Sequence, residues 1–299
     1  MNKLTKFKFG LIGWPVGHSF SPALHAAALE SCGLKGEYTL FPICPSSGEN
    51  RALADVIQQV RQGSLHGINV TIPHKQSVIP LLDRLTLAAQ EIGAVNTIYV
   101  KNGYLIGDNT DAQGFLLDLK NKMLRQPVQK AALVLGAGGS SRAVTYTLSR
   151  AGWHVIVAAR RLTQAQVLVN NLSSGQNFDI TACCLSPDDL LGLQPALIVN
   201  TTPVGMSPNI SNSPWAFDIP FPQDCFIYDL IYNPKETLLV QQAKSSGLEA
   251  SGGLGMLVEQ AALSFEIWTG YSASRLAIVE AVEKHTKNAI SDMEETHGP

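Results

Sequence analysis

The sequence is poor in charge, and the charges it has are balanced. Charged side chains make up only 15% of the 299 residues, with 22 Lys and Arg against 24 Asp and Glu. Without a basic excess to neutralise a phosphate backbone, nucleic acid is not expected as the main partner. Hydrophobic residues, by contrast, reach 45%. That fraction excludes a disordered chain and predicts a globular protein of roughly two domains at about 150 residues each.

Cysteine and long apolar runs are also scarce. The five cysteines include no C-x-x-C pair, so neither a zinc site nor a disulfide framework is predicted. We expect reduced thiols in a cytoplasmic protein, and no bound metal. No apolar run is long enough for a membrane span or a signal-peptide core, so no membrane partner is expected.

Apolar, β-rich runs alternate with helical patterns along most of the sequence. Such alternation is typical of α/β proteins with largely parallel sheets. In the first helix, Ser21 is predicted as the N-cap, Pro22 as the first helical residue and Gly33 as the stop. The buried strands are predicted at residues 7–12, 38–43, 67–72, 131–135, 155–159, 180–183, 196–200 and 226–230.

Three further features outline the domain organisation. Asn102-Gly103 between two apolar runs predicts a tight β-hairpin. The polar, proline-containing stretch 125–130 suggests a domain boundary after a helix that starts near Asp111. Two helices are expected near the C-terminus, over 254–268 and 273–287, followed by a frayed polar tail.

A glycine motif provides the clearest chemical signal. GAGGSS at 136–141 lies between a predicted strand and a predicted helix. Glycines there let the backbone approach a pyrophosphate, and the helix N-terminus supplies amide donors. The third glycine of the usual fingerprint is replaced by Ser141, and a tight turn without a ligand would look similar. Because strand, loop and helix all occur in order, dinucleotide binding is favoured.

The next predicted strand indicates which dinucleotide binds. NAD sites usually place a carboxylate near its end to hydrogen-bond the ribose 2′-hydroxyl. Here the strand ends at Ala159 and is followed by Arg160 and Arg161. A guanidinium can pair with a 2′-phosphate, although solvated surface arginines are the alternative interpretation. The pattern favours NADP.

A lysine follows a short apolar strand. The run 67–72 stops at Pro73, and His74 and Lys75 come next. The carboxyl end of a parallel strand is where α/β proteins bind ligands. Most lysines are simply solvated, so this position alone does not make Lys75 catalytic. His74 is a packing or a surface residue.

Other polar residues allow two interpretations each. Asp111 either caps a helix or holds a lysine from another segment. Ser19 and Ser21 supply two hydroxyls at a helix N-terminus. Either Ser21 only caps the helix, or the two hydroxyls bind a small carboxylate, and neither role excludes the other. Gln260 lies on the flank of an apolar helical stripe, and Tyr232 follows an apolar strand where core tyrosines are common.

Taken together, these segments resemble the shikimate dehydrogenase family. The matching motifs occur in the family's order over nearly the whole chain: GHSFSP at 17–22, NVTIPHK at 69–75, GAVNT at 93–97, DNTD at 108–111, GAGG at 136–139, NTTPVGM at 200–206, DLIYNP at 229–234 and GGLGMLVEQ at 252–260.

The resemblance implies a fold and a reaction. The fold has a substrate domain with a mixed, mainly parallel sheet over 1–111, completed by helices at 254–287, and a Rossmann-like NADP domain over 112–253. The active site would lie in the cleft between the domains, and residues 288–299 would be a disordered tail. The implied activity is the reversible NADPH-dependent reduction of 3-dehydroshikimate to shikimate, in aromatic amino acid biosynthesis, by a monomer or homodimer.

The resemblance also assigns roles to residues. Lys75 and Asp111 would form the catalytic pair, with Lys75 donating a proton to the substrate oxygen and Asp111 orienting it. Substrate would be bound by these two and by Ser19, Ser21, Thr71, Asn96, Tyr232 and Gln260. The cofactor would be bound by Gly136, Ala137, Gly138, Gly139, Ser140, Arg160, Arg161, Thr202, Met206, Leu230 and Gly253.

The arginine motif departs from the family pattern. The family usually has Asn where this chain has Ala159, Thr or Ser where it has Arg161, and a basic residue where it has Gln164. Some NAD use is therefore conceivable. The alternatives are a quinate/shikimate dehydrogenase, against which Ser21 argues, and a catalytically silent sensor, against which Lys75 and Asp111 argue.

Overall fold

The computed structural model describes residues 6–46, 48–125, 127–216 and 219–296. The chain divides into two compact units, each with its own six-stranded sheet. The first unit comprises Met1–Gln90, Ala94–Thr110 and Val258–Pro299, and the second comprises Glu91–Gly93 and Asp111–Leu257. The α/β class predicted from the sequence is confirmed.

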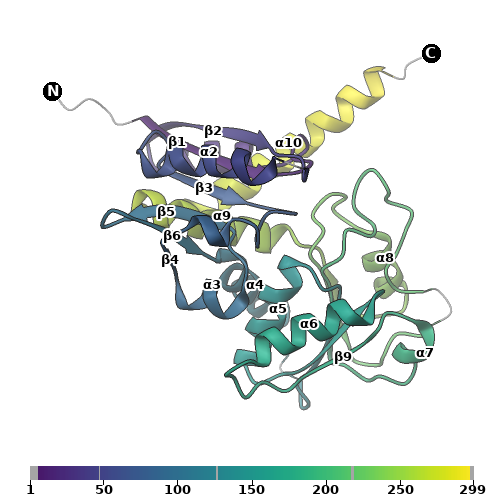
Figure 1. Cartoon of the computed structure of the whole chain (residues 1–299). Coiled ribbons are helices and arrows are strands. Elements are labelled where there is room, and N and C mark those ends of the chain that lie inside the picture. Colours follow the sequence, from purple (N-terminus) through teal and green to yellow (C-terminus); the bar gives the residue numbers. More distant parts are fainter. Residues whose placement is uncertain (1–5, 47, 126, 217–218, 297–299) are drawn as a thin grey trace. The chain divides into compact units, whose positions relative to one another are not determined.

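Strands and helices alternate through both units (Figure 1). Up to residue 122 the elements are β1 (Lys6–Gly13), α1 (Ser21–Ser31), β2 (Lys35–Pro42), α2 (Glu49–Arg61), β3 (Gly67–Val70), the 3₁₀ turn η1 (Ile79–Leu81), β4 (Arg84–Leu85), α3 (Leu87–Ile92), β5 (Thr97–Lys101), β6 (Tyr104–Asp108) and α4 (Thr110–Lys122). After it come β7 (Ala131–Leu135), α5 (Gly139–Arg150), β8 (His154–Ala159), α6 (Leu162–Ser173), β9 (Ile180–Cys184), α7 (Pro187–Leu190), β10 (Leu197–Asn200), β11 (Phe226–Asp229), α8 (Leu238–Ser245), β12 (Ala250–Ser251), α9 (Leu254–Thr269) and α10 (Arg275–Thr296).

The first sheet is mixed, as predicted. Its order is β2-β1-β3-β5-β6-β4. β1 pairs in parallel with β2 and β3, whereas β5 pairs antiparallel with β3 and β6. The predicted hairpin is confirmed: Asn102 and Gly103 both adopt positive φ, 53° and 79°, as the tight turn between β5 and β6 requires.

Helices cover both faces of this sheet. On one face, Ile12, Ile68 and Ile98 share a core with Leu53 of α2 and Ala89 of α3. The other face is aromatic, and its residues come from distant parts of the chain. There Phe9 stacks on Trp268 of α9 at 4.8 Å, and α1 packs against both β2 and α10. Trp268 lies so close to Gly67 that a Cβ there would be 2.2 Å from the indole, which explains the glycine.

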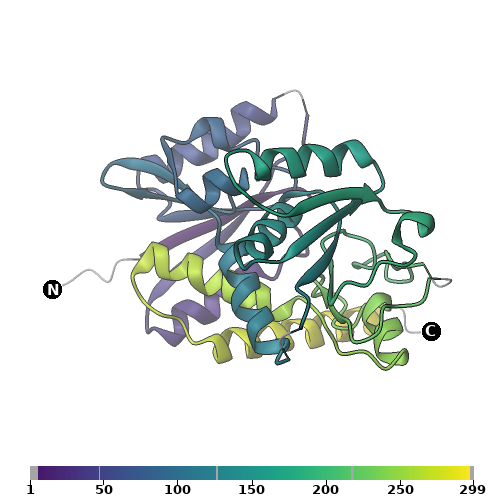
Figure 2. The same cartoon turned by 90° about the horizontal axis from the view of Figure 1, so that it is seen from below.

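The second sheet is all-parallel, with the order β12-β11-β10-β7-β8-β9. Alternate residues of its strands enter two cores. Val134 points into the core with α4, α5 and α6, whereas Leu133 points into the core with α7 and α8. α6 runs along β8 and β9 (Figure 2). Because helices cover both faces of this sheet, residues on both sides of each strand are buried, and the strands are continuously apolar.

Two predictions about the organisation of the chain are wrong, one about the stretch 125–130 and one about the last helix. The stretch 125–130 is not a domain boundary, because it joins α4 to β7 within the second unit. Phe115 and Leu119 of α4 are buried in the same core as Val134, so α4 packs on the sheet that follows it. Polar composition here reflects an ordinary connecting loop.

The last helix also ends later than predicted. α10 continues to Thr296, past the expected end at Lys287 and into the segment predicted as a frayed tail. The sequence contains no glycine or proline between Lys287 and Gly298, so no strong helix breaker interrupts the helix. Residues 297–299 of that tail lie outside the described residues.

Candidate functional site

Two loops of the first unit meet at the carboxyl edge of its sheet. The chain leaves β1 for β2 on one side and later returns to β3 on the other, so β1 and β3 form a topological switch point. The loop 14–20 follows β1, and the loop 71–75 follows β3. They are joined where the N–H of Trp14 donates to the carbonyl of Ile72 at 2.9 Å, and Thr71 is half-buried in the second loop. Open α/β sheets bind ligands at such points.

Ser19 and Ser21 lie together at the start of α1. The Ser19 hydroxyl donates to the Ser21 hydroxyl at 3.1 Å and accepts the backbone N–H of Ser21 at 3.2 Å. The prediction of Ser21 as the N-cap is wrong, because Phe20 occupies that position and Ser21 is the first helical residue. Ser19, rather than Ser21, satisfies an amide of the first turn.

Lys75 follows a buried histidine. The ring of His74 is fully buried, with Nδ1 2.9 Å from the Glu49 carboxylate and Nε2 2.7 Å from the carbonyl oxygen of Ile43. Of the two interpretations left open for His74, packing is therefore the right one. The carbonyl of Lys75 accepts the N–H of Val95 at 2.8 Å. Hydrogen bonds on both residues thus fix the backbone that carries the lysine.

Asn96 is only 2% exposed and holds the start of α4. Its Oδ1 accepts the N–H of Thr110 at 2.8 Å and the Thr97 hydroxyl at 2.9 Å, while its Nδ2 donates to the Thr110 hydroxyl at 2.9 Å. Thr110 is the first residue of α4, so the Asn96 carboxamide satisfies an amide that the helix itself cannot. This contact fixes the backbone immediately before Asp111.

Three buried polar residues of this unit were not among the predicted site residues: Asn69, Thr97 and Ser264. Nδ2 of Asn69 donates to the Ser264 hydroxyl at 3.0 Å and to the Asn96 carbonyl at 3.1 Å. Ser264 donates in turn to the carbonyl of Gln260, one turn earlier on α9, at 3.0 Å. The network therefore links Asn96 to the turn that carries Gln260. A signal existed, since Ser264 interrupts the apolar side of its helix and a buried hydroxyl needs partners.

Asp111 and Tyr232 belong to the second unit. Asp111 is 5% exposed and lies in the first turn of α4, one residue beyond the helix start, so it is not the N-cap. Tyr232 follows β11 and is half-buried, and burial raises the pKa of its hydroxyl. Lys75 lies in the first unit, and its pairing with Asp111 stays a prediction.

The second unit has a switch point of its own, between β7 and β10. Gly136 directly follows β7, and Thr201 directly follows β10. Gly136 has a φ of +113°, and a Cβ there would lie 2.6 Å from the Thr201 hydroxyl. Only glycine fits this close approach. The glycine loop thus lies at the point where this sheet is expected to bind a ligand.

The N-terminus of α5 is open to an anion. Its N-cap is Gly138, which supplies no side-chain hydrogen bond, and a Cβ on Gly138 would meet nothing within 4 Å. Amides at the first turn, on Gly139 and Ser140, therefore have no capping side chain. Ser141, at the position of the usual third glycine, is fully buried and donates to the carbonyl of Gly136 at 2.7 Å. These features fit a dinucleotide pyrophosphate.

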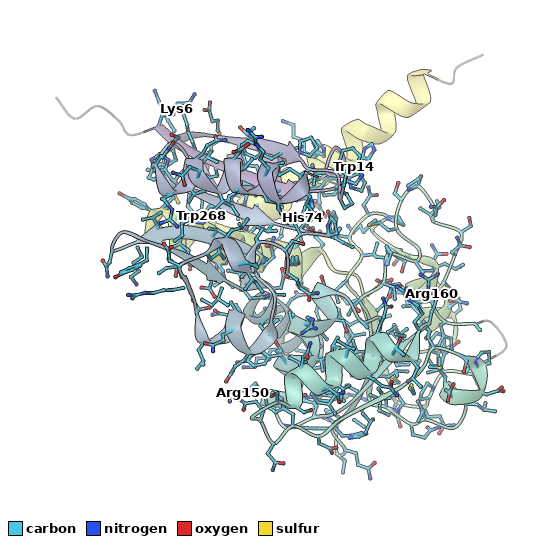
Figure 3. The ribbon with its side chains drawn as sticks, viewed as in Figure 1. Lys6, Trp14, His74, Arg150, Arg160 and Trp268 are labelled. Carbon is cyan, nitrogen blue, oxygen red and sulfur yellow. The ribbon has the colours of Figure 1, made fainter. Side chains whose placement is uncertain are left out.

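Arg160 and Arg161 follow β8, as predicted. Both are exposed (Arg160 is labelled in Figure 3), and no carboxylate in the described part of the chain pairs with either. Arg161 is the N-cap of α6, whose first turn contains no acidic residue. Two guanidiniums and a helix N-terminus at the end of one strand make a surface suited to a phosphate.

The remaining cofactor candidates lie on the loops after the neighbouring strands. Thr202 and Met206 follow β10, Leu230 follows β11, and Gly253 follows β12. A Cβ on Gly253 would lie 2.1 Å from the carbonyl oxygen of Leu230, so glycine is required there. Met206 is 45% exposed and offers an adaptable apolar surface on its loop.

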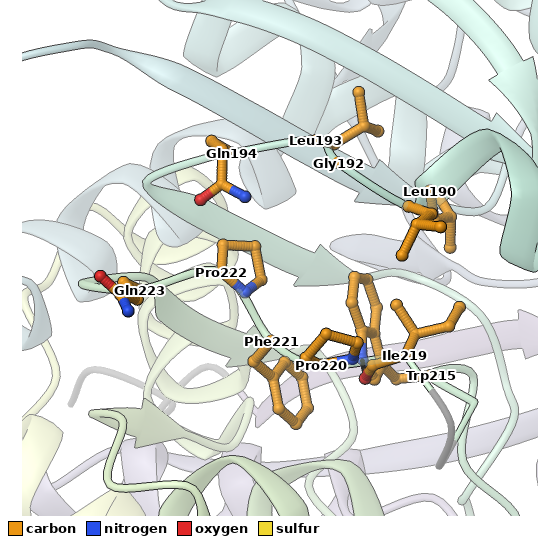
Figure 4. A pocket seen from close by; sticks show the side chains of 11 residues that line it. Leu190, Gly192, Leu193, Gln194, Trp215, Ile219, Pro220, Phe221, Pro222 and Gln223 are labelled. Carbon is orange, nitrogen blue, oxygen red and sulfur yellow. Dashed lines mark hydrogen bonds between the residues drawn. The ribbon is translucent and has the colours of Figure 1, made fainter.

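A separate pocket of about 260 Å³ lies beside the core of the second unit that contains Leu133 (Figure 4). It is lined by residues 190–194, Trp215 and residues 219–223, and none of these is a predicted site residue. Trp215 stacks on Phe221 at 5.1 Å and donates its indole N–H to the carbonyl of Ile219 at 2.9 Å. None of the lining residues is charged, so this pocket has no evident chemistry.

Among the described residues, no cluster of three or more His, Cys, Asp and Glu could hold a metal ion. None of the helices in that part of the chain is long and apolar enough to cross a membrane.

The glycine loop at the switch point of an all-parallel sheet, next in the chain to a second α/β unit with hydroxyl and amide side chains at its own switch point, is typical of dinucleotide-binding α/β proteins. Known proteins similar to this chain narrow the class further. The shikimate dehydrogenase substrate binding domain matches residues 11–98, and the shikimate 5′-dehydrogenase C-terminal domain matches residues 253–283.

Whole-chain relatives agree. The NADP⁺ shikimate dehydrogenase of Caldanaerobacter subterraneus subsp. tengcongensis is 39% identical, over 88% of this chain and 91% of its own. A crystal structure of a shikimate dehydrogenase with NADP⁺ is similar at 35% identity and a TM-score of 0.84, covering 95% of this chain and 97% of that one. The Thermus thermophilus enzyme with NADP(H) and shikimate is similar at 37% identity and a TM-score of 0.78, covering 93% and 99%. The chain belongs to the shikimate dehydrogenase family.

Proposed function

We propose that the chain catalyses the reversible, NADPH-dependent reduction of 3-dehydroshikimate to shikimate, a step of aromatic amino acid biosynthesis. The observation that carries this proposal is the pair of switch points. One has hydroxyl and amide side chains suited to a polyhydroxylated carboxylate, and the other has an open glycine loop suited to a dinucleotide.

The first unit, completed by α9 and α10, binds the substrate in this proposal, and the second unit binds NADP. Ser19 and Ser21 donate to the substrate carboxylate, which prefers hydroxyl donors near a helix N-terminus. The ring hydroxyls and the carboxylate are held by Thr71, Lys75, Asn96, Asp111, Tyr232 and Gln260. The adjacent hydroxyls of Ser19 and Ser21, 3.1 Å apart, support the carboxylate assignment.

Lys75 and Asp111 carry the acid–base chemistry in this proposal. In the reductive direction the Lys75 ammonium donates a proton to the substrate's C3 oxygen as negative charge develops there. Asp111 orients the ammonium. Bound NADPH supplies the hydride. The hydrogen bonds that fix the backbone around Lys75 and before Asp111 support precise placement of both groups.

The cofactor is held mainly by backbone in this proposal. Gly136, Ala137, Gly138, Gly139 and Ser140 surround the pyrophosphate at the α5 N-terminus. Arg160 and Arg161 bind the 2′-phosphate, with the amides of α6 nearby in the chain. Thr202, Met206, Leu230 and Gly253 surround the nicotinamide. The five cysteines are free thiols, which supports a reducing compartment such as the cytoplasm.

Initial rates with shikimate or quinate, each paired with NADP⁺ or NAD⁺, test the proposal. We expect the highest kcat/KM for shikimate with NADP⁺. Faster turnover of quinate, or a preference for NAD⁺, would identify the chain as a quinate/shikimate dehydrogenase instead. Binding of shikimate without turnover of any pair would identify a sensor. Either outcome overturns the proposed activity.

A further inference from the structure

A pair of buried side chains joins the loops of the second unit that surround the proposed nicotinamide position. Asn200 ends β10 and Asp229 ends β11, and both are fully buried. Nδ2 of Asn200 donates to Oδ1 of Asp229 at 2.9 Å. Neither residue is among the groups proposed above to touch the cofactor.

Asn200 organises the loop after β10. Its Oδ1 accepts the N–H of Thr202 at 2.9 Å and the Thr202 hydroxyl at 2.7 Å. That hydroxyl also accepts the N–H of Val204 at 3.2 Å. One carboxamide therefore sets the course of the loop from Thr202 towards Met206.

Asp229 organises the loop after β11. The same Oδ1 that accepts from Asn200 accepts the N–H of Ile231 at 3.0 Å, and Oδ2 accepts the Thr237 hydroxyl at 2.6 Å. The carbonyl of Ile231 in turn accepts the N–H of Gly253 at 2.9 Å. The carboxylate thus connects Asn200 to the backbone on which Leu230 and Gly253 lie.

We infer that Asn200 and Asp229 are positioning residues that set the spacing of the nicotinamide-binding loops. The inference rests on the proposed function, because it needs Thr202, Met206, Leu230 and Gly253 to contact the cofactor. Within the described residues the pair makes no hydrogen bond to Arg160 or to the glycine loop, although Gly136 lies close to Thr201. It should therefore affect the nicotinamide half of the cofactor more than the adenine half.

The experiment measures two dissociation constants by calorimetry, one for NADP⁺ and one for adenosine 2′,5′-bisphosphate, which contains only the adenine half. Asn200→Ala loses the hydrogen bonds to both loops, so we expect its Kd for NADP⁺ to rise on the order of tenfold. Its Kd for the bisphosphate should stay within about twofold. Equal increases in both constants, or no increase, would overturn the inference.

Two further variants separate positioning from general stability. Asp229→Asn keeps Oδ1 as the acceptor for Asn200 and Ile231, so its ratio of the two constants should stay near the wild-type value. Thr147→Ala removes a buried hydroxyl of α5 that donates to the carbonyls of Ala143 and Ala112, away from these loops. It should lower stability without changing the ratio. A changed ratio in Thr147→Ala would contradict the inference.

If Asn200→Ala does not fold, Asn200→Asp replaces it. The new carboxylate can still accept from Thr202, but it faces Asp229 instead of donating to it, so the Kd for NADP⁺ should again rise selectively. A wild-type chain that binds no NADP⁺ would overturn the proposed function itself. Normal NADP⁺ binding by the wild type, with an unchanged ratio in the Asn200 variants, would overturn only the positioning role.

Discussion

The two units place candidate sites at equivalent points of different sheets, yet they build them differently. At the β1–β3 switch point the polar groups are side chains, such as the hydroxyls of Ser19 and Ser21. At the β7–β10 switch point the loop is shaped by glycines, and the open α5 N-terminus offers backbone amides. A small polyhydroxylated substrate needs directional side-chain contacts, whereas a pyrophosphate can be held by amides common to many proteins.

The two units also differ in the kind of ionisable group that they bury. In the first unit His25 is 1% exposed, and neither ring nitrogen has a hydrogen-bond partner among the described residues. Burial therefore lowers the pKa of His25 to about 3. In the second unit Asp229 is fully buried, and burial raises its pKa to about 6 despite three hydrogen-bond donors. In both groups burial disfavours the charged form, and because one is a base and the other an acid, the two units respond oppositely to acid.

The largest expected effect on turnover concerns Lys75. If it acts mainly in the transition state, Lys75→Ala should lower kcat by at least about 10²-fold with little change in KM. Asp111→Asn should be similarly impaired, and the double variant far from additive. Lys101→Ala, an exposed lysine of the same unit, is the control and should behave like wild type. Near-normal turnover by Lys75→Ala would refute the catalytic role.

Acid stability should expose the buried histidine of the first unit. An unfolded His25 titrates near 6.5 and the folded one near 3, so its contribution to stability is complete above about pH 6.5 and is lost as the pH falls towards 3. Each unit of difference corresponds to about 1.4 kcal/mol. His25→Phe, which keeps the aromatic stack on Tyr38, should flatten the acid limb of urea unfolding. An unchanged slope would mean that His25 does not titrate on unfolding.

The cofactor preference should depend on one side chain of the second unit. A charge-assisted contact from Arg160 to the 2′-phosphate should favour NADP⁺ over NAD⁺ by about tenfold. We expect no larger preference because this chain has Ala159 and Gln164 where the family usually has an asparagine and a basic residue. Arg160→Ala should lose most of that preference in kcat/KM. Arg150→Ala, another exposed arginine of the unit, is the control (Figure 3). A preference retained in Arg160→Ala would assign the role to Arg161.

The second unit should show the opposite response to acid. The folded pKa of Asp229 is about 6 against 3.8 for an unfolded Asp, so the folded state binds more protons between these values. Its contribution to stability therefore falls as the pH rises from about 4 to 6. Asp229→Asn should lack this decline. The free energy of unfolding should therefore differ between the variant and the wild type by an amount that changes with pH only between about pH 4 and 6. A constant difference would contradict the raised pKa.

The sequence predicted best what short-range chemistry determines. Asn102-Gly103 specifies its turn through positive φ, and Gly136 marks a loop that only glycine can form. The sequence did not determine two other features. The N-cap of α1 is Phe20 rather than the predicted Ser21, a shift of one residue, and the sequence leaves His74 open between packing and surface because its partners, Glu49 and Ile43, come from distant segments. No local pattern encodes those partners.

The central claim is that the substrate site and the cofactor site are separate. Its most direct test is one set of initial rates, with shikimate and NADP⁺ both varied, for Ser19→Ala and Arg160→Ala. We expect Ser19→Ala to raise KM for shikimate roughly 10- to 150-fold, the equivalent of a lost hydrogen bond of about 1.5–3 kcal/mol, and to leave KM for NADP⁺ nearly unchanged. Arg160→Ala should do the reverse. If either variant raises both KM values in equal proportion, the two sites are not separate in the way proposed.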